Sequence, residues 1–255
     1  MEPERQDETA SPEPAIEASE KREEFPFWGY RDLLALAALV LPCLAAAGLL
    51  VGAAFAVLRV PPAPRAMLLL AAQFLAYGLW FGCIWMLFHV KYRRPFWESM
   101  AWKGRRDNIA AAALAGPPLA LLIGFAGAAL GKDKTDIPMM ELLKDPVSIA
   151  LVGAFAVTLG PVCEELAFRG IMLPLVTRSF GPVAGVTLSA LPFALLHGPQ
   201  YGWSWARVLL IAVAGAAFGA VRLRMGSTQA AAAMHATYNL TFVAAFLLQR
   251  NLGRV

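Results

Sequence analysis

The chain of 255 residues has the composition of a membrane protein. Hydrophobic residues make up 58% of the sequence and charged residues only 16%, and the mean hydropathy is +0.57. These values exclude an ordinary soluble domain of this length. The formal net charge is +4, and the basic side chains concentrate in short loops, which indicates membrane topology signals rather than nucleic-acid binding.

The first 25 residues differ from the rest of the chain. They contain nine acidic and three basic side chains, are rich in Pro, Ser and Ala, and include no apolar segment typical of a signal peptide. We predict a disordered acidic tail at 1–25. N-terminal transmembrane helices with a basic loop follow at 26–146, and a C-terminal core at 147–250.

Seven apolar segments follow the tail. Most exceed the roughly 20 residues that a helix needs to span about 30 Å of hydrocarbon, and lipid satisfies no free backbone group, so helices are expected. We predict an all-α polytopic protein of about seven transmembrane helices, with the active site inside the C-terminal helix bundle. The fourth segment from the start carries two glutamates. The segments are 33–58, 66–90, 108–131, 148–176, 181–197, 208–221 and 225–249.

The basic loop predicts the orientation in the membrane. The positive-inside rule places it in the cytoplasm, which puts the N-terminus inside and, with seven spans, the C-terminus outside. We expect a multi-pass protein of the cell (inner) membrane whose main partner is the lipid bilayer. In the short span 208–221, we expect Arg207, Arg222 and Arg224 to extend toward the headgroups. The loop's basic residues are Lys91, Arg93, Arg94, Lys103, Arg105 and Arg106.

Two adjacent acids stand out in the apolar C-terminal half. After Asp145 the chain has 110 residues with only two acidic side chains, Glu164 and Glu165, and a charged side chain within a bilayer costs a few kcal/mol or more. On a helix, Glu165 and Arg169 are spaced i, i+4 and can form an ion pair. Glu164 projects about 100° away, so we expect it to remain free as a candidate general base.

Two further patterns add histidines to this half. Phe193 precedes His197 by one helical turn and is expected to pack beside its imidazole. His235 and Asn239 are also spaced i, i+4, so they share one face of the last span. An imidazole and an amide on one face suit the binding of a carbonyl or a developing oxyanion. Intramembrane ionisable groups are functional candidates by default, and their coincidence on three spans favours an active site.

Three patterns in this half resemble those of the CPBP family of intramembrane proteases. In order along the chain they are EE-x-x-x-R, F-x-x-x-H and H-x-x-x-N. That family includes the type II CAAX prenyl endopeptidases and bacterial relatives linked to bacteriocin processing and self-immunity. The three patterns match without a substitution at the defining positions, and the resemblance covers about 147–248. It implies a glutamate-dependent endopeptidase whose core is 147–250 and whose substrate is a membrane-associated protein or peptide.

The resemblance also implies roles for individual residues. Glu164 would act with His197 to activate the attacking water, and His235 with Asn239 would hold the oxyanion. Glu165 and Arg169 would be supporting residues that orient this group and tie the helices together, and Phe193 would support His197. No cofactor is expected from this assignment.

Several alternatives remain open from the sequence. Glu164, His197 and His235 could be three ligands of a divalent metal such as zinc, with water in the fourth position, although no H-E-x-x-H motif is present. Cys163 could act as a thiol nucleophile. The chain could also be a non-catalytic membrane scaffold or immunity protein of the same fold, or a proton-coupled transporter.

The expected depths of Glu164 and His197 in the membrane do not agree. At about 1.5 Å per residue, Glu164 lies deep from one side of the membrane, whereas His197 lies near the opposite end of its span. Their contact requires shifted span limits, a kink near Pro161 or Pro192, or a different topology. The sequence leaves these alternatives open.

Overall fold

The computed structural model describes residues 25–59, 65–131 and 135–253, and within these ranges the regular structure is entirely helical. The predicted disordered tail lies outside the described residues, apart from Phe25. The chain is a multi-pass membrane protein, as the composition predicted. The elements of the N-terminal half are α1 (Tyr30–Val57), α2 (Arg65–Met86), the π-helix η1 (Leu87–Lys91), α3 (Phe96–Ser99), α4 (Arg106–Ala129) and the 3-10 helix η2 (Pro138–Leu143).

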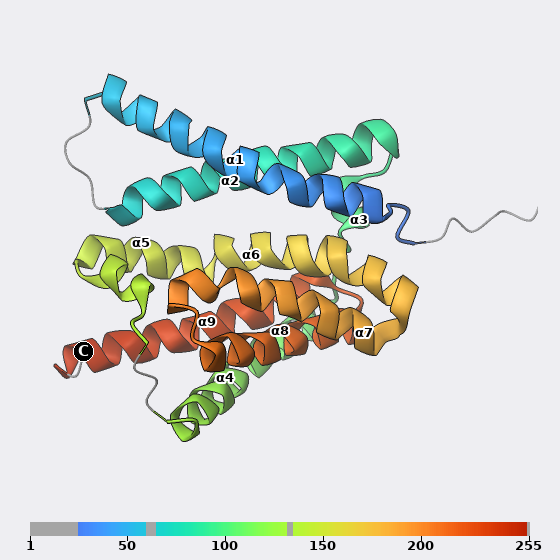
Figure 1. Ribbon diagram of the computed structural model, residues 1–255. Coiled ribbons are helices and arrows are strands. Elements are labelled where there is room, and N and C mark those ends of the chain that lie inside the picture. The colour runs from blue at the N-terminus through green and yellow to red at the C-terminus, as the bar shows by residue number, and fades with distance from the viewer. Residues whose placement is uncertain (1–24, 60–64, 132–134, 254–255) are drawn as a thin grey trace, which may run out of the picture.

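The C-terminal half begins with helix α5 (Pro146–Val157), and Asp145 caps its N-terminus. The Asp145 side chain accepts a hydrogen bond from the Ser148 amide at 2.9 Å. Figure 1 shows α1 and α2 as a separate pair above the remaining helices. The elements of this half are α5 (Pro146–Val157), α6 (Leu159–Glu165), the π-helix η3 (Leu166–Met172), α7 (Leu173–Leu196), the 3-10 helix η4 (Gly198–Tyr201), α8 (Trp205–Met225) and α9 (Thr228–Asn251).

Six helical segments of the described chain are long and apolar enough to cross a membrane, and one of them, Pro146–Leu196, has 51 residues. This segment contains a kink at Gly181, whose φ of 82° lies in the left-handed region that favours glycine. Phe168 and Phe193 lie on opposite sides of the kink, yet their ring centroids are 5.3 Å apart. The segment therefore folds back on itself at Gly181 and forms two packed arms, which agrees with the predicted total of about seven spans (Figure 1).

The fold-back resolves the conflict of depths. Glu164 is 17 residues before Gly181 and His197 is 16 residues after it, so two antiparallel arms place them at the same level. The first arm also breaks at Thr158, whose φ and ψ of −125° and −88° are not helical. Pro161 explains the break, because a proline ring clashes with the carbonyl four residues earlier, here that of Val157. A kink near Pro161 was one of the alternatives that the sequence left open, and the chain breaks at this point.

The α1–α2 pair contacts the first arm at the end where α1 begins and η1 ends. Trp28 is buried, and its Nε1 donates a hydrogen bond to the Ile171 carbonyl at 3.1 Å. Asp32 accepts hydrogen bonds from Lys91 Nζ and Tyr92 Oη, both at 2.5 Å, which fixes the start of α1 to the end of η1. The Trp28 hydrogen bond thus joins the start of the N-terminal helices to the arm that carries the two glutamates, whereas the Asp32 contacts lie within the N-terminal half.

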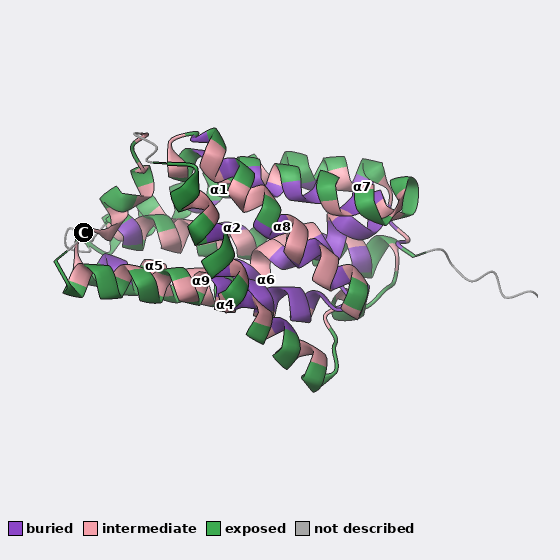
Figure 2. Ribbon diagram, turned by 90° about the horizontal axis from the view of Figure 1, so that it is seen from below, coloured by how far each residue is buried: buried purple, intermediate pink, exposed green. Residues whose placement is uncertain are grey.

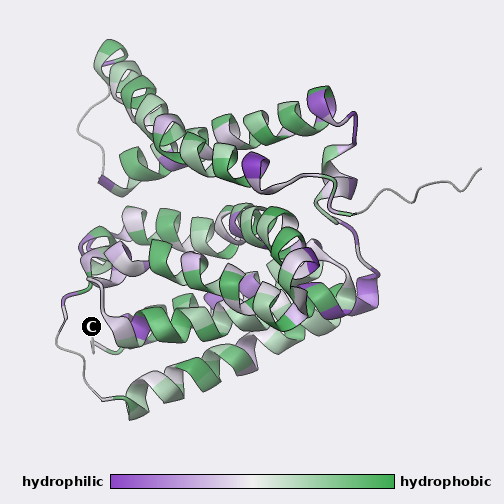
Figure 3. Cartoon of the chain, turned by 45° about the vertical axis from the view of Figure 1, so that its right-hand side comes forward, coloured by the Kyte–Doolittle hydropathy of each residue, from purple (hydrophilic) through white to green (hydrophobic). Residues whose placement is uncertain are grey.

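Helices α4 and α9 approach closely in the C-terminal core. A Cβ on Gly116 would lie 2.0 Å from Thr237 Oγ1 and 2.5 Å from the Met234 carbonyl oxygen, so only glycine fits this crossing. Thr237 Oγ1 also donates to the Ala113 carbonyl at 2.6 Å. Figure 2 shows buried residues gathered around α6 and α8 and exposed ones along α1 and α5. Apolar residues cover much of the helical surface in Figure 3, as expected for lipid contact.

Two expectations for the last spans need correction. Helix α8 runs over Trp205–Met225, longer than 208–221, and α9 begins at Thr228 rather than at Met225 because Gly226 (φ 62°) ends α8. Arg222 does not extend toward the headgroups. It is buried, and its Nε donates to Thr228 Oγ1 at 2.9 Å across the α8–α9 turn.

Candidate active site

The two glutamates lie at the end of α6, directly before the π-helix η3. Wide π turns are frequent at functional sites, and this one carries Arg169 on the same arm. Glu165 is fully buried, whereas the Glu164 side chain is 22% exposed. The two neighbours therefore occupy different environments, as their angular separation on the helix predicted.

Glu165 and Arg169 form the predicted ion pair. Glu165 Oε2 and Arg169 Nε are 3.1 Å apart, and both side chains are fully buried. Arg169 Nη2 also donates to the Gly215 carbonyl at 2.6 Å, which ties the first arm to α8. A Cβ on Gly215 would lie 3.1 Å from Arg169 Nη2 and 2.9 Å from Phe193 Cδ1. The bare backbone at Gly215 thus allows the guanidinium to reach α8.

Aromatic rings enclose the Arg169 guanidinium. Its centre is 4.5 Å from the centroid of Phe193, 5.8 Å from that of Phe168 and 5.7 Å from that of Phe218. Rings at these distances stabilise a desolvated cation. The same rings reach the histidines, because Phe193 lies 4.8 Å from His197 and Phe218 stacks on His235 at 4.5 Å with an interplanar angle of 19°. The predicted contact of Phe193 with His197 is confirmed.

His235 is oriented by the second carboxylate. Its Nδ1 lies 2.9 Å from Glu165 Oε1, in hydrogen-bond distance, and a carboxylate can only accept, so Nδ1 carries a proton. This contact joins α9 to α6 across 70 residues of sequence. Glu165 therefore has two partners, Arg169 through Oε2 and His235 through Oε1.

Glu164 faces both imidazoles. Its Oε2 is 3.9 Å from His197 Nε2 and 3.8 Å from His235 Nε2. His197 Nδ1 lies 2.8 Å from the Phe193 carbonyl oxygen, which only accepts, so this nitrogen is the protonated one and Nε2 of the neutral ring is an acceptor. Both imidazole Nε2 atoms thus lie near the same carboxylate oxygen, slightly beyond direct hydrogen-bond distance.

Asn239 follows His235 by one helical turn on α9 and contacts the end of α5. Its Nδ2 donates to the Ala156 carbonyl at 2.7 Å. Ala156 lies in the last turn of α5, where carbonyls have no partner within the helix, so Asn239 satisfies an acceptor that the break at Thr158 exposes. The amide retains a second N–H.

Tyr201 and Phe218 are near the site but were not predicted. Burial raises the pKa of Tyr201 in η4, and the negative charge of Glu164 adds to this rise while Arg207 opposes it, so Tyr201 is within electrostatic reach of Glu164. In the sequence, Tyr201 stands close to two other aromatic residues, Trp203 and Trp205, and no motif indicates that it lies near the site. Phe218 lies on α8 among small residues, and only the tertiary packing places it on His235.

The three potential metal ligands are close but do not form a metal site as they stand. Two ligand atoms of a tetrahedral zinc site with bonds of about 2.0–2.1 Å are about 3.3 Å apart, shorter than the 3.8 and 3.9 Å separations from Glu164 Oε2. Among the described residues, no group of three or more His, Cys, Asp and Glu has the geometry to hold a metal ion. We therefore derive no catalytic step through a metal.

Comparison with known families bears directly on this arrangement. A family model described as type II CAAX prenyl endopeptidase Rce1-like matches residues 146–241. This segment is similar to the Rce1-like family. The match confirms the family resemblance predicted from the three motifs. The matched segment begins at α5, ends within α9 and contains every candidate site residue. Searches of curated proteins and of solved structures found no match to the chain.

Proposed function

We propose that the chain is an intramembrane endopeptidase that hydrolyses a peptide bond of a membrane-associated protein or peptide with water activated by Glu164. One observation carries this proposal: Glu164 Oε2 lies 3.9 Å from His197 Nε2 and 3.8 Å from His235 Nε2. Polar groups separated by slightly more than 3.5 Å suit a bridging water. The family match supports the reaction class.

Glu164 and His197 share the activation of the water. The hydrogen bond of His197 to the Phe193 carbonyl directs its Nε2 lone pair at the same point as the Glu164 carboxylate. The water oxygen attacks the carbonyl carbon of the substrate while Glu164 takes one proton. Glu164 then passes this proton to the leaving amine as the C–N bond breaks. The second proton of the water stays on the new carboxyl group, so the products are one carboxylic acid and one amine, and Glu164 is again a carboxylate.

His235 and Asn239 stabilise the oxyanion in this proposal. His235 already donates through Nδ1 to Glu165, so it donates through Nε2 only when it carries a second proton. Glu165 is placed to stabilise that imidazolium. Asn239 contributes the N–H that is not used by the Ala156 carbonyl. Donors aimed at a developing oxyanion typically contribute about 10²–10³-fold each in rate.

The substrate is a segment that reaches the site from the membrane. A leader peptide, a CAAX-type C-terminus and a C-terminal sorting segment all fit a peptidase with this position. The proposed location is the cell (inner) membrane, with the basic loop in the cytoplasm.

A comparison of protein termini in cells tests the proposal. Cells with the wild type, Glu164→Gln, His197→Ala and the control Glu98→Gln are compared by mass spectrometry of membrane-protein termini. Glu98 is exposed on α3, far from the motifs in sequence. We expect one or more uncut proteins to accumulate in the Glu164 and His197 variants alone. Identical termini in all four strains would refute the peptidase.

A further inference from the structure

A groove of about 450 Å³ lies between α5 and α9, away from the two histidines. Its wall is formed by apolar and small side chains over most of its length, and its polar residues, Arg250 and Asn251, are at the end of α9. Ala150 and Ala154 on α5 are exposed, so their small side chains leave the groove open toward the surrounding lipid. The lining residues are Pro146, Ile149, Ala150, Gly153, Ala154, Val157, Leu240, Val243, Leu247, Arg250 and Asn251.

The length of the groove matches one leaflet of a bilayer. From Leu240 to Arg250 the helix rises about 15 Å at 1.5 Å per residue, and α5 contributes a similar length from Pro146 to Val157. The hydrocarbon core of a membrane is about 30 Å thick. The groove therefore runs from the membrane surface, where α5 begins and α9 ends, to about the midplane.

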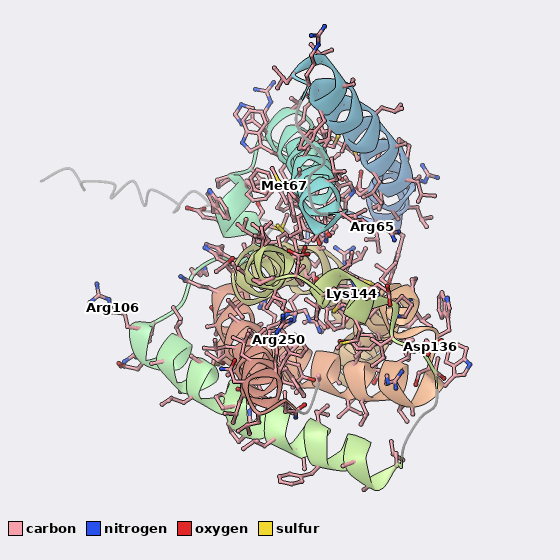
Figure 4. The ribbon with its side chains drawn as sticks, turned by 90° about the vertical axis from the view of Figure 1, so that its left-hand side faces the viewer. Arg65, Met67, Arg106, Asp136, Lys144 and Arg250 are labelled. Atoms are coloured by element: carbon pink, nitrogen blue, oxygen red, sulfur yellow. The ribbon has the colours of Figure 1, made fainter. Side chains whose placement is uncertain are left out.

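Arg250 supplies a cation at the surface end of the groove. Its Nη1 donates to the Leu143 carbonyl at 3.3 Å, which holds the guanidinium in place, and a guanidinium has further N–H donors. No carboxylate of the described residues forms an ion pair with Arg250. Figure 4, which views this end of the molecule, labels both Arg250 and Lys144 there.

Two acidic side chains at this end, Glu141 and Asp145, have other partners. Glu141 pairs with Lys144 at 2.5 Å. Hydrogen bonds from Ser148 hold the pKa of Asp145 below its usual range, and its carboxylate caps α5. Arg250 thus binds a neutral carbonyl at the end of the groove, and its guanidinium is complementary to a phosphate.

We propose that the α5–α9 groove is a phospholipid-binding site, which takes one acyl chain along its apolar wall and the lipid phosphate at Arg250. The inner end of the groove, at Val157 and Leu240, adjoins the Ala156–Asn239 contact. A bound acyl chain fills the space between α5 and α9 and keeps these helices in register. This site is independent of the peptidase assignment, because binding is measured without any substrate.

Photo-crosslinking tests the site directly. Detergent-solubilised protein is titrated with a phosphatidylcholine that carries a diazirine in one acyl chain, and the labelled peptides are mapped by mass spectrometry. We expect saturable labelling of α5 and α9 in the wild type, while the exposed apolar surface of α1 is labelled without saturation. The variant Ala154→Phe fills the groove and should abolish the saturable component.

Variants of Arg250 test the phosphate contact separately from the acyl-chain contact. Arg250→Gln should weaken the saturable labelling about tenfold, as expected for loss of a charged hydrogen bond, and Arg250→Lys should restore much of it. Lys144→Gln, at the same end, should leave it unchanged. Thermal unfolding shows that each variant is folded. Non-saturable labelling of the groove in the folded wild type overturns the site, and saturable labelling unaffected by Arg250→Gln overturns the phosphate contact.

Discussion

Glu164 and His197 are 33 residues apart in the chain, yet Glu164 Oε2 and His197 Nε2 face each other at 3.9 Å. The fold-back at Gly181 creates this relationship, because it sets two arms of nearly equal length side by side. A site for polar chemistry thus forms in the interior of apolar helices. The fixed orientation of His197, through its contact with the Phe193 carbonyl, leaves its Nε2 lone pair directed at Glu164.

The two adjacent glutamates should respond differently to loss of charge. Glu164→Gln removes the proposed base and should lower cleavage by about 10²–10⁴-fold with little change in stability. Glu165→Gln leaves the buried Arg169 without its ion partner, and breaking a buried pair typically costs about 3–5 kcal/mol. Thermal unfolding of the purified variants, together with substrate cleavage in cells, measures both effects. Equal losses of activity and stability from the two changes would return the pair to a purely structural role.

The helix-forming pattern and the local pairs were predictable from the sequence. The apolar segments predicted the spans to within a few residues, and i, i+4 spacing predicted both the Glu165–Arg169 pair and the contact of Phe193 with His197. These interactions depend on one helix alone, and helical geometry is fixed by the backbone. The family motifs also identified the side chains that converge.

The contacts between distant segments were not predictable. Two hydrogen bonds depend on how α9 packs against the first arm, and no local spacing in the sequence encodes that packing. They join His235 to Glu165 and Asn239 to the Ala156 carbonyl. The fold-back at Gly181 had a signal, a glycine before Pro182 within an apolar run. That signal marks a turn but does not give the resulting alignment of the arms.

Gly215 should tolerate no side chain. An alanine Cβ there would lie 2.9 Å from Phe193 and 3.1 Å from Arg169 Nη2, so we expect Gly215→Ala to displace both residues, to lower stability by about 1–3 kcal/mol and to reduce cleavage. Gly219→Ala is the matched control one turn later, because its Cβ would be 3.6 Å from Val186, an ordinary contact. Thermal unfolding distinguishes the two variants, and equal effects would argue against the close approach at Gly215.

Asn239→Ala should affect both the backbone and the chemistry. Loss of the amide leaves the Ala156 carbonyl without its donor, so we expect faster hydrogen exchange near the break at Thr158. Loss of an oxyanion donor should also reduce the rate of cleavage about 10²–10³-fold. Hydrogen-exchange mass spectrometry and a cleavage assay measure the two effects. Faster exchange with an unchanged cleavage rate would restrict Asn239 to a structural role.

Catalysis should not require a metal. The separations from Glu164 Oε2 to the two Nε2 atoms exceed those of a tetrahedral zinc site, so we expect activity to survive chelation. Metal analysis of the purified protein and a cleavage assay after chelator treatment provide the check. Stoichiometric zinc together with chelator-sensitive activity would instead make Glu164, His197 and His235 ligands.

The role of Glu164 as the catalytic base is tested most directly by comparing Glu164→Gln with Cys163→Ala on the first substrate identified in cells. Both side chains lie at the end of α6, and each is a candidate for the attack on the peptide bond, the carboxylate through water and the thiol as a nucleophile. Cleavage is followed by mass spectrometry with purified, membrane-reconstituted protein. We expect no product with Glu164→Gln and near wild-type product with Cys163→Ala, whereas retained cleavage in Glu164→Gln would contradict the role of Glu164 as the base.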